Sequence, residues 1–376
     1  MKKVNYLVSH PIQYQIGMIK AVNKYCDLQV FYIDDYSFSE HNDNSFGGNL
    51  SINWGVDLKS GYKYKVLKKI YKFKSNNVSP RPTLFNPITL INKKLLFGEC
   101  DAYWIHGYSH YSQILIAVWA KIRFKKLFFR AESNLVFTKC GPIKNVLVKI
   151  LLAMADKLLY VSSLNKEYYI HYGASSGKLV FMPYAVNNRM YECEIKEANS
   201  NDKNLRLVFV GKLIPRKNVK VIIRALSLID TKNISLVIVG SGSEEQEVAN
   251  MITEFNLKHC VNMVGFKQPY EVAKILGESD LILVPSFEEA FGLVVNEGMA
   301  AGCAVISSNL VGSTIDLVKH NENGFVFNPD DHTTLSKYIS KIDQDRVMLK
   351  KFKQKSHSII QEWSYETDAL AIKDIL

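Results

Sequence analysis

The chain has 376 residues, of which 47% are hydrophobic and 22% charged, so it is long enough for two domains with sizeable cores. No apolar run reaches the roughly 18 residues of a membrane-spanning helix, and the apolar stretch after Met1 is too short for a secretory signal. Six scattered cysteines form no C-x-x-C pair, which argues against a disulfide framework or a zinc site. We therefore expect reduced thiols and a cytoplasmic protein.

The net charge of +11 is unevenly distributed. Residues 1–185 contain 25 Lys and Arg against 11 Asp and Glu, whereas the remainder contains 22 against 25. A strongly basic half suggests an anionic partner, either nucleic acid or an anionic membrane.

The first half alternates between apolar strand-like runs and amphipathic helical segments. Strands are expected at 4–9, 28–33, 101–106, 127–130 and 158–162, and helices at 16–25, 113–123, 143–155 and 164–172. Residues 34–55, rich in Asp, Asn, Ser and Gly, are expected to form a loop. Strands that alternate with helices predict a parallel, doubly wound α/β sheet.

A polar stretch around residues 192–204 has no periodicity and is expected to be a linker. The alternation then restarts with strands at 205–210, 236–239, 261–264, 281–284 and 304–307, and helices at 218–229, 244–255, 270–277 and 293–301. Further helical segments fill 333–375. This pattern predicts a second Rossmann-like sheet. Ligands bind such sheets outside the carboxyl ends of the strands.

The most informative stretch is 285–302, PSFEEAFGLVVNEGMAAG, which directly follows the apolar run LILV. A strand, a turn with Gly292 and a helix start create an anion site, because the first helical turn has free N–H groups and the positive end of the dipole. If Glu289 and Glu297 shared one helix, they would lie about 12 Å apart along its axis. That exceeds the roughly 5 Å separation of a retaining glycosidase pair. We therefore expect two separate roles, hydrogen bonding to sugar hydroxyls and to ribose hydroxyls; the alternative is a solvated loop glutamate and a helix-terminal glutamate.

This stretch resembles the signature of retaining GT-B glycosyltransferases of the large family-four class. The family pattern is roughly P-S-x-x-E-x-F-G-L-x-x-x-E-A-M-A-x-G, and the chain departs from it at Gly298, where alanine is usual. The resemblance implies two facing Rossmann-like domains with a cleft between them. Residues 1–190, with a returning helix at about 362–376, would bind the acceptor, and residues 204–361 would bind the nucleotide sugar. It also implies retention of anomeric configuration. No D-x-D motif lies at a plausible cleft position, so we expect basic residues and helix N-termini in place of a metal, and no cofactor.

The resemblance also assigns residues to the donor. Lysines at two family positions after the strand LRLVFV would grip the diphosphate, although lysine replaces the usual arginine at 212 and Asn218, a potential helix cap, replaces glycine. The implied donor set is Lys212, Lys217, Phe291, Gly292 and Leu293 for the diphosphate, Glu289 for the sugar, Glu297 for the ribose, and Gly240, Val264, Gly265 and Phe266 for the base. These motifs do not distinguish bases by themselves; we favour UDP over GDP.

The acceptor side is less well defined by the resemblance. The loop S-H-P-I-Q-Y-Q supplies His10 and Gln13 as candidates, with a packed strand-end histidine as the alternative for His10. Many relatives carry a histidine where this chain has Arg130-Ala131-Glu132. Either His106 takes that role or Glu132 acts as the acceptor base, and we favour Glu132 if burial raises its pKa.

Two basic segments of the first half are candidates for surface binding. Residues 63–74 (KYKVLKKIYKFK) interleave six lysines with aromatic residues, and 121–126 (KIRFKK) add four cations. They could contact anionic lipid, bind nucleic acid or form a solvated face.

We therefore predict a glycosyltransferase that moves a sugar from a nucleotide diphosphate sugar to a glycan or lipid-linked acceptor, in bacterial surface polysaccharide synthesis such as capsule or lipopolysaccharide. We expect it at the inner face of the cytoplasmic membrane, without a nucleic-acid partner. The alternatives are a catalytically silent sugar-nucleotide-binding homologue, a nucleotide-sugar epimerase and a basic nucleic-acid-binding protein.

Overall fold

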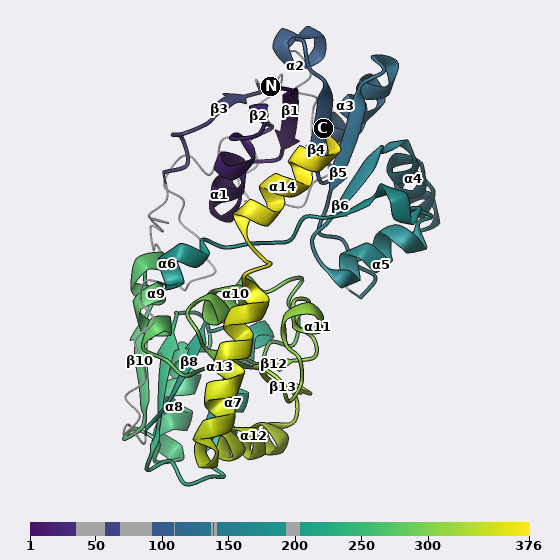
Figure 1. Cartoon of the computed structure of the whole chain (residues 1–376). Coiled ribbons are helices and arrows are strands. Elements are labelled where there is room, and N and C mark those ends of the chain that lie inside the picture. The colour runs from purple at the N-terminus through teal and green to yellow at the C-terminus, as the bar shows by residue number, and fades with distance from the viewer. Residues whose placement is uncertain (35–56, 68–91, 109, 137, 139–140, 193–203) are drawn as a thin grey trace. The chain divides into compact units, whose positions relative to one another are not determined.

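The computed structural model describes residues 1–34, 57–67, 92–108, 110–136, 138, 141–192 and 204–376. The chain divides into two compact units (Figure 1). The first contains the described part of residues 1–184 together with Tyr365–Leu376, and the second contains Ala185–Ser364.

The first unit is built on a seven-stranded parallel sheet of order β3-β2-β1-β4-β5-β6-β7. Its strands are β1 (Lys3–Val8), β2 (Asp27–Tyr32), β3 (Lys63–Val66), β4 (Ala102–His106), β5 (Lys126–Arg130), β6 (Lys157–Tyr160) and β7 (Leu179–Phe181). Its helices are α1 (Gln13–Val22), α2 (Lys93–Phe97), α3 (Tyr111–Ile122), α4 (Pro142–Met154), α5 (Ser163–His171), the 3-10 turn η3 (Ser176–Lys178) and α14 (Tyr365–Ile375).

Helices cover both faces of this sheet. On one face, α1 and the C-terminal α14 share an apolar core with side chains such as Trp104 and Phe128. On the other face, α2 to α5 pack on Leu7, Phe31 and Phe129. The central strands β1, β2 and β4 are therefore buried on both sides, as their continuous apolar runs predict.

The second unit contains a six-stranded parallel sheet of order β10-β9-β8-β11-β12-β13. Its strands are β8 (Leu205–Val210), β9 (Ile234–Val239), β10 (Val261–Gly265), β11 (Leu281–Val284), β12 (Ala304–Ser308) and β13 (Gly324–Phe327). Its helices are α6 (Asn188–Glu192), η4 (Pro215–Lys217), α7 (Lys220–Leu226), α8 (Glu245–Glu254), α9 (Pro269–Gly277), α10 (Leu293–Ala300), α11 (Thr314–Leu317), α12 (His332–Gln344) and α13 (Arg346–Ile360). The prediction of two doubly wound Rossmann-like sheets is confirmed.

Each sheet has a point where the strand order reverses direction. In the first unit this switch lies between β1 and β4, and in the second between β8 and β11. Parallel α/β sheets bind ligands outside the carboxyl ends of the strands at such a point. The topology therefore directs attention to the loops after these four strands.

The basic segment 63–74 is only partly described, and its described part is not a surface helix. Residues Lys63–Val66 form the edge strand β3, and Lys63 is ion-paired with Asp27 at 2.7 Å. Residues 68–74 lie outside the described residues, as do Cys140 and Cys193. The expected loop at 34–55 also lies outside them, except for Asp34. Edge strands tolerate charged side chains, which explains a lysine-rich sequence at this position.

The second basic segment, 121–126, is largely committed to contacts within the first unit. Lys121 pairs with Asp156 at 2.8 Å, and the Arg123 guanidinium donates to carbonyl oxygens of Leu96 and Gly98. It therefore does not form the free basic patch that its sequence suggested.

Candidate functional site

The loops after β8 and β9 interlock through glycines. A Cβ on Gly240, whose φ is +137°, would lie 1.9 Å from the carbonyl oxygen of Gly211. A Cβ on Gly242 would lie 2.3 Å from the carbonyl oxygen of Leu213, and the amide of Leu213 donates to Ser241 at 2.9 Å. Gly240, expected in the base pocket, thus allows two backbone loops to meet at the carboxyl edge of the sheet.

The third predicted loop closes the same edge. The Gly240 amide donates to the carbonyl oxygen of Gly265 at 2.8 Å, and β10 has a register irregularity between Met263 and Gly265, where Val264 lies. Gly265 has a φ of +68°, with open space where a Cβ would point. Val264 and Phe266 are half-buried on either side of it. This loop therefore offers backbone groups and partly exposed side chains beside Gly240.

The switch point of the second sheet brings Lys217 and Glu289 together. Lys217 ends η4 after β8, Glu289 follows β11, and their ammonium and carboxylate groups form an ion pair. The two loops are tied side by side, because the Phe287 amide donates to Arg216 at 2.9 Å and the Arg216 guanidinium donates to the Glu288 carbonyl at 2.8 Å. Two side chains assigned to different parts of the donor thus neutralise each other in this structure.

Gly292 starts α10 in a conformation that other residues rarely adopt. Its φ is +94°, and a Cβ there would lie 2.8 Å from Val311 Cγ1 and 3.1 Å from Glu289 Cγ. The turn is fixed by backbone hydrogen bonds from Gly312 to Glu289 and from Ser313 to Phe291. The glycine therefore directs the N-terminus of α10, with Leu293 as its first residue, beside the Lys217–Glu289 pair.

Phe291 contributes packing rather than an exposed side chain. It is buried, and its ring lies 5.9 Å from that of Trp363. Any contribution it makes to a ligand therefore comes from its backbone.

Glu297 lies on α10 and is the most perturbed carboxyl of this region. Burial raises its pKa to about 7, against the opposing effects of a hydrogen bond from Tyr191 and the charge of Lys217. Glu289, Lys217 and Glu297 therefore form one cluster. A carboxyl group whose pKa is raised close to 7 by desolvation is typical of a functional site.

Two residues of the loop after β8, Lys212 and Asn218, were singled out from the sequence. Lys212 lies half-buried between Gly211 and Leu213, beside the interlocked glycines. The prediction that Asn218 caps the next helix is wrong: its backbone is left-handed with φ of +54°, and its side-chain amide donates to the carbonyl oxygens of Pro285 and Pro329. Asn is the residue that best tolerates this conformation after glycine, which explains the replacement.

The switch point of the first sheet brings His106 and Glu132 together. The Nε2 of His106, at the end of β4, lies 3.6 Å from Glu132 Oε1 in the loop after β5. The imidazole Nδ1 is hydrogen-bonded to the Tyr6 hydroxyl at 3.0 Å. Burial lowers the pKa of His106, while the hydrogen bond to Glu132 opposes this. The two alternative candidates thus form a single pair.

The condition under which Glu132 was favoured as the base, burial of its carboxyl group, is not met in the structure. Its side chain is 44% exposed, whereas His106 is buried. An exposed carboxylate can accept a proton from a bound hydroxyl group. The buried imidazole of His106 can hold that carboxylate in place.

The predicted loop residues His10 and Gln13 have different surroundings. His10 is partly buried, its Nδ1 lies 3.0 Å from Ser9 Oγ, and burial lowers its pKa to about 4. It is therefore neutral at physiological pH. Gln13 begins α1. The glutamine that reaches His106 is Gln15, whose Nε2 lies 3.4 Å from the imidazole Nε2.

Sequence reasoning missed three residues of this site. Tyr6 and Gln15 touch His106, and burial together with the neighbouring Glu132 raises the pKa of Tyr14. Tyr6 reads as a core strand position, so no local signal marks it. The helix α1 begins at Gln13 and not, as the sequence predicted, at Ile16. With the correct start, Gln15 would have been predicted on the buried face of the helix.

Arg130 lies outside this site. Its guanidinium donates to the carbonyl oxygens of Met182 and Pro183 and lies 3.9 Å from the buried carboxylate of Asp368 on α14. It therefore holds α14 and the end of the first unit to β5.

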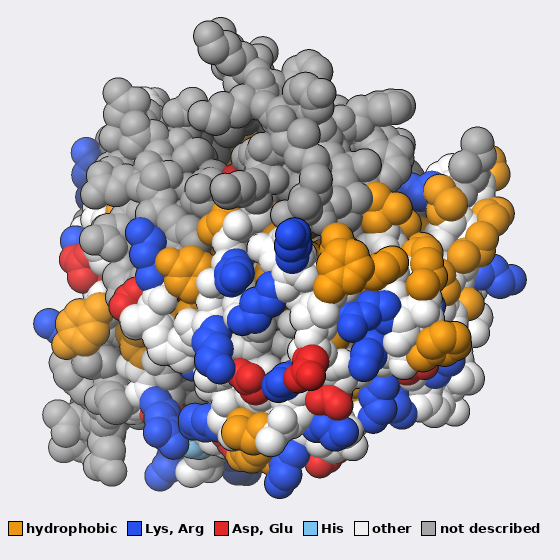
Figure 2. Space-filling model, turned by 90° about the horizontal axis from the view of Figure 1, so that it is seen from above, with side chains coloured by type: hydrophobic (Ala, Val, Ile, Leu, Met, Phe, Trp, Pro, Cys, Tyr) orange, Lys and Arg blue, Asp and Glu red, His pale blue; other side chains and the backbone are white. Residues whose placement is uncertain are grey.

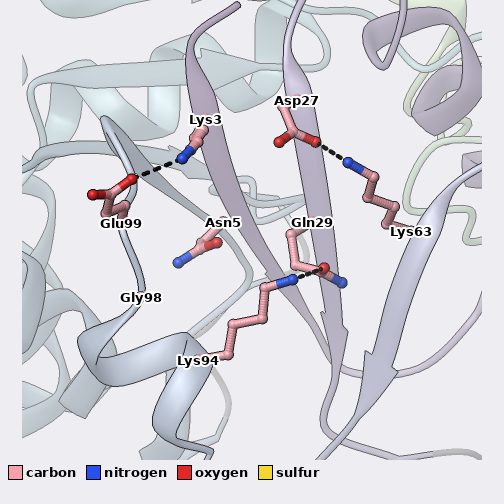
Figure 3. Close-up of a pocket in the computed structure, with 8 residues that line it drawn as sticks. All are labelled: Lys3, Asn5, Asp27, Gln29, Lys63, Lys94, Gly98 and Glu99. Carbon is pink, nitrogen blue, oxygen red and sulfur yellow. Dashed lines mark hydrogen bonds and ion pairs between the residues drawn. The ribbon is translucent and has the colours of Figure 1, made fainter.

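A polar pocket lies at the opposite, amino-terminal edge of the first sheet (Figure 3). Its charged groups are largely paired among themselves, Lys3 with Glu99 and Lys63 with Asp27, while Lys94 donates to Gln29 at 2.9 Å. Because this edge carries the amino ends of the strands, the pocket is separate from the predicted sites.

Two kinds of feature are absent from the described residues. No group of three or more His, Cys, Asp or Glu side chains in that part of the chain could hold a metal ion. Within the same residues, no helix combines the length and apolar character needed to cross a bilayer.

The fold has many relatives among solved structures. Anabaena HepE in complex with UDP superposes with a TM-score of 0.72 at 17% identity, covering 100% of this chain and 99% of that one. The apo form of the lipopolysaccharide outer core galactosyltransferase WaaB gives a TM-score of 0.70 at 17% identity and covers 100% of both chains. The fold is therefore that of the GT-B glycosyltransferases.

Residues 191–358 match the model of the family described as glycosyl transferases group 1. The chain is also 27% identical over 202 residues to the amylovoran biosynthesis glycosyltransferase AmsK of Erwinia amylovora, covering 52% of this chain and 49% of that protein. It is 27% identical over 184 residues to the capsular polysaccharide biosynthesis glycosyltransferase CapM of Staphylococcus aureus, covering 48% and 47%. The chain spans about half the length of these curated relatives.

Proposed function

We propose that the protein is a retaining, metal-independent glycosyltransferase that uses a UDP-sugar to glycosylate a hydroxyl of a glycan or lipid-linked acceptor in polysaccharide synthesis. The observation that carries this proposal is the cluster of Lys217, Glu289 and Glu297 beside the Gly292 turn at the switch point of the second sheet. It combines a cation, two carboxylates and a helix N-terminus, which suit a diphosphate joined to two polyols.

In this proposal the donor exchanges the internal ion pair for its own contacts. Lys217 turns from Glu289 to the diphosphate, with Lys212 as a second cation and the amides of α10 as donors. Glu289 is then released to accept hydrogen bonds from sugar hydroxyls. Glu297 accepts hydrogen bonds from the ribose hydroxyls, which stabilise its charged form against the cost of burial.

The leaving group determines what these cations do. As the bond between the anomeric carbon and the phosphate oxygen breaks, negative charge grows on the diphosphate. Lysine ammonium groups already positioned there stabilise that charge without reorganisation. This role requires no metal ion, which is the basis for proposing a metal-independent reaction.

The His106–Glu132 pair is proposed to serve the acceptor. Glu132 would take the acceptor hydroxyl proton, and His106, held by Tyr6 and Gln15, would position Glu132. Neutral His10 lies at the same switch point as this pair. A 25% identical relative in Campylobacter jejuni is named for transfer to a diphospho-undecaprenol-linked acceptor, which supports a glycan or lipid-linked acceptor for this protein.

The test is donor turnover with water as the acceptor, which needs no knowledge of the natural acceptor. We expect UDP release from one UDP-sugar in the presence of EDTA, loss of release in Lys217→Met, and a product with retained anomeric configuration by NMR. Inverted product would refute the retaining mechanism. UDP binding without release, with any sugar and with membrane lipid extracts added, would support a catalytically silent homologue instead.

A further inference from the structure

The helices α3 and α4 of the first unit expose apolar side chains at the centre of their outward faces. On α4, Val146 is 59% and Ile150 is 53% exposed, whereas the buried residues Val148, Leu151 and Leu152 occupy the opposite side. Residues four apart share one face of a helix, so Val146 and Ile150 form a stripe. Water-facing helices of globular domains normally carry polar residues there.

The neighbouring helix repeats this pattern. Leu115, Val118 and Ile122 follow the spacing of three and four residues along α3 and are 37%, 40% and 60% exposed. Because α3 and α4 cover the same face of the sheet side by side, the two stripes form one surface. We call Leu115, Val118, Ile122, Val146, Leu147 and Ile150 the α3–α4 surface.

The second unit provides an internal comparison. Helix α8 also covers one face of a parallel sheet, but its exposed residues are polar: Glu245, Gln246, Glu247, Asn250, Thr253 and Glu254. The apolar outward face is therefore a property of these helices and not of the fold.

The charge around the α3–α4 surface is mainly positive, although Lys121 at the end of α3 pairs with Asp156 just after α4 and Arg130 is buried. Residues 102–155 contain eight Lys and Arg and a single acidic residue, Glu132. Lys149 flanks the apolar stripe of α4, and Lys144 lies in the first turn of the same helix. Both lysines are exposed, and neither has an ion pair with any described residue. On the side where Figure 1 places α3 to α5, Figure 2 shows hydrophobic side chains interleaved with Lys and Arg.

We propose that the α3–α4 surface binds an anionic lipid membrane. Apolar side chains that enter the headgroup region, flanked by lysines at headgroup height, are the features that interfacial helices use. A nucleic-acid partner would match the lysines but would leave the apolar stripes in water. The surface also begins next to the candidate acceptor site, because the exposed Leu135 and Val136 follow Glu132 and lead into α4.

The proposal goes beyond the transferase function and is tested without any sugar nucleotide. The full chain is mixed with vesicles of phosphatidylcholine, with or without phosphatidylglycerol, and bound protein is measured by flotation. We expect binding to the anionic vesicles, weakened at least about tenfold in the double variant Val146→Glu/Ile150→Glu. The double variant Lys144→Gln/Lys149→Gln should weaken binding to anionic vesicles about 25-fold, at about fivefold for each lysine.

Matched controls lie in the second unit. Val347 on α13 is an exposed apolar helix residue, 67% exposed, and Lys351 is an exposed lysine of the same helix. Val347→Glu and Lys351→Gln should bind vesicles like the wild type. Equal loss of binding in the controls or no flotation of the wild type would overturn the proposal. So would a wild-type protein that does not bind vesicles but forms a dimer that Val146→Glu/Ile150→Glu converts to a monomer.

A further arm tests single-stranded RNA and DNA. Binding tighter than to anionic vesicles, with loss in the lysine variant only, would also overturn the proposal. Stabilisation by UDP, measured on every variant, separates this proposal from the transferase function, because vesicle binding without a nucleotide effect would contradict only the latter.

Discussion

Glu297 allows a specific prediction about how much folding stability the candidate donor site costs the protein. In the folded protein burial raises its pKa from 4.5 to about 7, so the unfolded chain releases this proton at lower pH than the native state. The stability that Glu297 contributes is fully present below about pH 4.5, falls as the pH rises, and is lost above about pH 7. At about 1.4 kcal/mol per pKa unit, the loss is about 3 kcal/mol.

The substitution Glu297→Gln removes the charge and keeps an oxygen that can accept the hydrogen bond from Tyr191. We expect this variant to be about 2–3 kcal/mol more stable than the wild type at pH 8, and close to the wild type at pH 4.5. It should also lose UDP binding, because a neutral amide is a weaker partner for ribose hydroxyls than a carboxylate.

Urea unfolding of both proteins at a series of pH values measures this difference. Glu254→Gln, which changes an exposed carboxyl of α8, is the matched control and should show no pH-dependent difference. A stability difference between Glu297→Gln and the wild type that is the same at pH 4.5 and pH 8, or that favours the wild type at pH 8, would refute the assignment of a desolvated carboxyl with a raised pKa.

Three further predictions concern the backbone, the diphosphate cation and the buried pair of the first unit. Gly292→Ala should cost about 2 kcal/mol of stability and abolish nucleotide binding, because of its φ of +94° and the side chains around it, whereas Gly265→Ala, with open space around it, should cost about 1 kcal/mol. Lys217→Met should weaken UDP binding at least about tenfold in calorimetry, because a charge-assisted contact is lost. Arg130→Met should destabilise the protein by about 3 kcal/mol in urea unfolding, since it leaves Asp368 buried without a partner, and Asp368→Asn should cost less.

Each of these has a result that would contradict it. Equal costs for the two glycine variants would mean that the Gly292 contacts are relaxed easily. Unchanged UDP affinity in Lys217→Met would place the diphosphate elsewhere. A larger cost for Asp368→Asn than for Arg130→Met would mean that the carboxylate, and not the guanidinium, holds α14.

Much of the second unit could be predicted from sequence because its signals are local. The buried run Leu281–Val284 stops at a proline, Gly292 and the two glutamates follow at fixed spacing, and the strand and helix bounds were nearly right. What the sequence did not reveal was that Lys217 and Glu289 pair with each other, since they are 72 residues apart and meet only through the strand order.

The first unit was less predictable because its site depends on long-range packing. His106 contacts Tyr6, 100 residues away, and Gln15, 91 residues away, and neither partner has a local signature. The strand β3 was missed because its alternation of lysine with tyrosine and valine reads equally well as a basic surface segment. Asn218 was misjudged because its capping propensity is visible in sequence and its left-handed backbone is not.

The central claim, that the second unit binds a nucleoside diphosphate sugar, is tested most directly by unfolding the protein with UDP, GDP and ADP and their sugar conjugates, without metal. At about 100 times its dissociation constant, a bound nucleotide should stabilise the protein by about 2.7 kcal/mol. The account predicts this shift with UDP and a UDP-sugar, and its absence in Glu297→Ala and Lys217→Ala. No stabilisation by any of these nucleotides, or an equal shift in both variants, would contradict it.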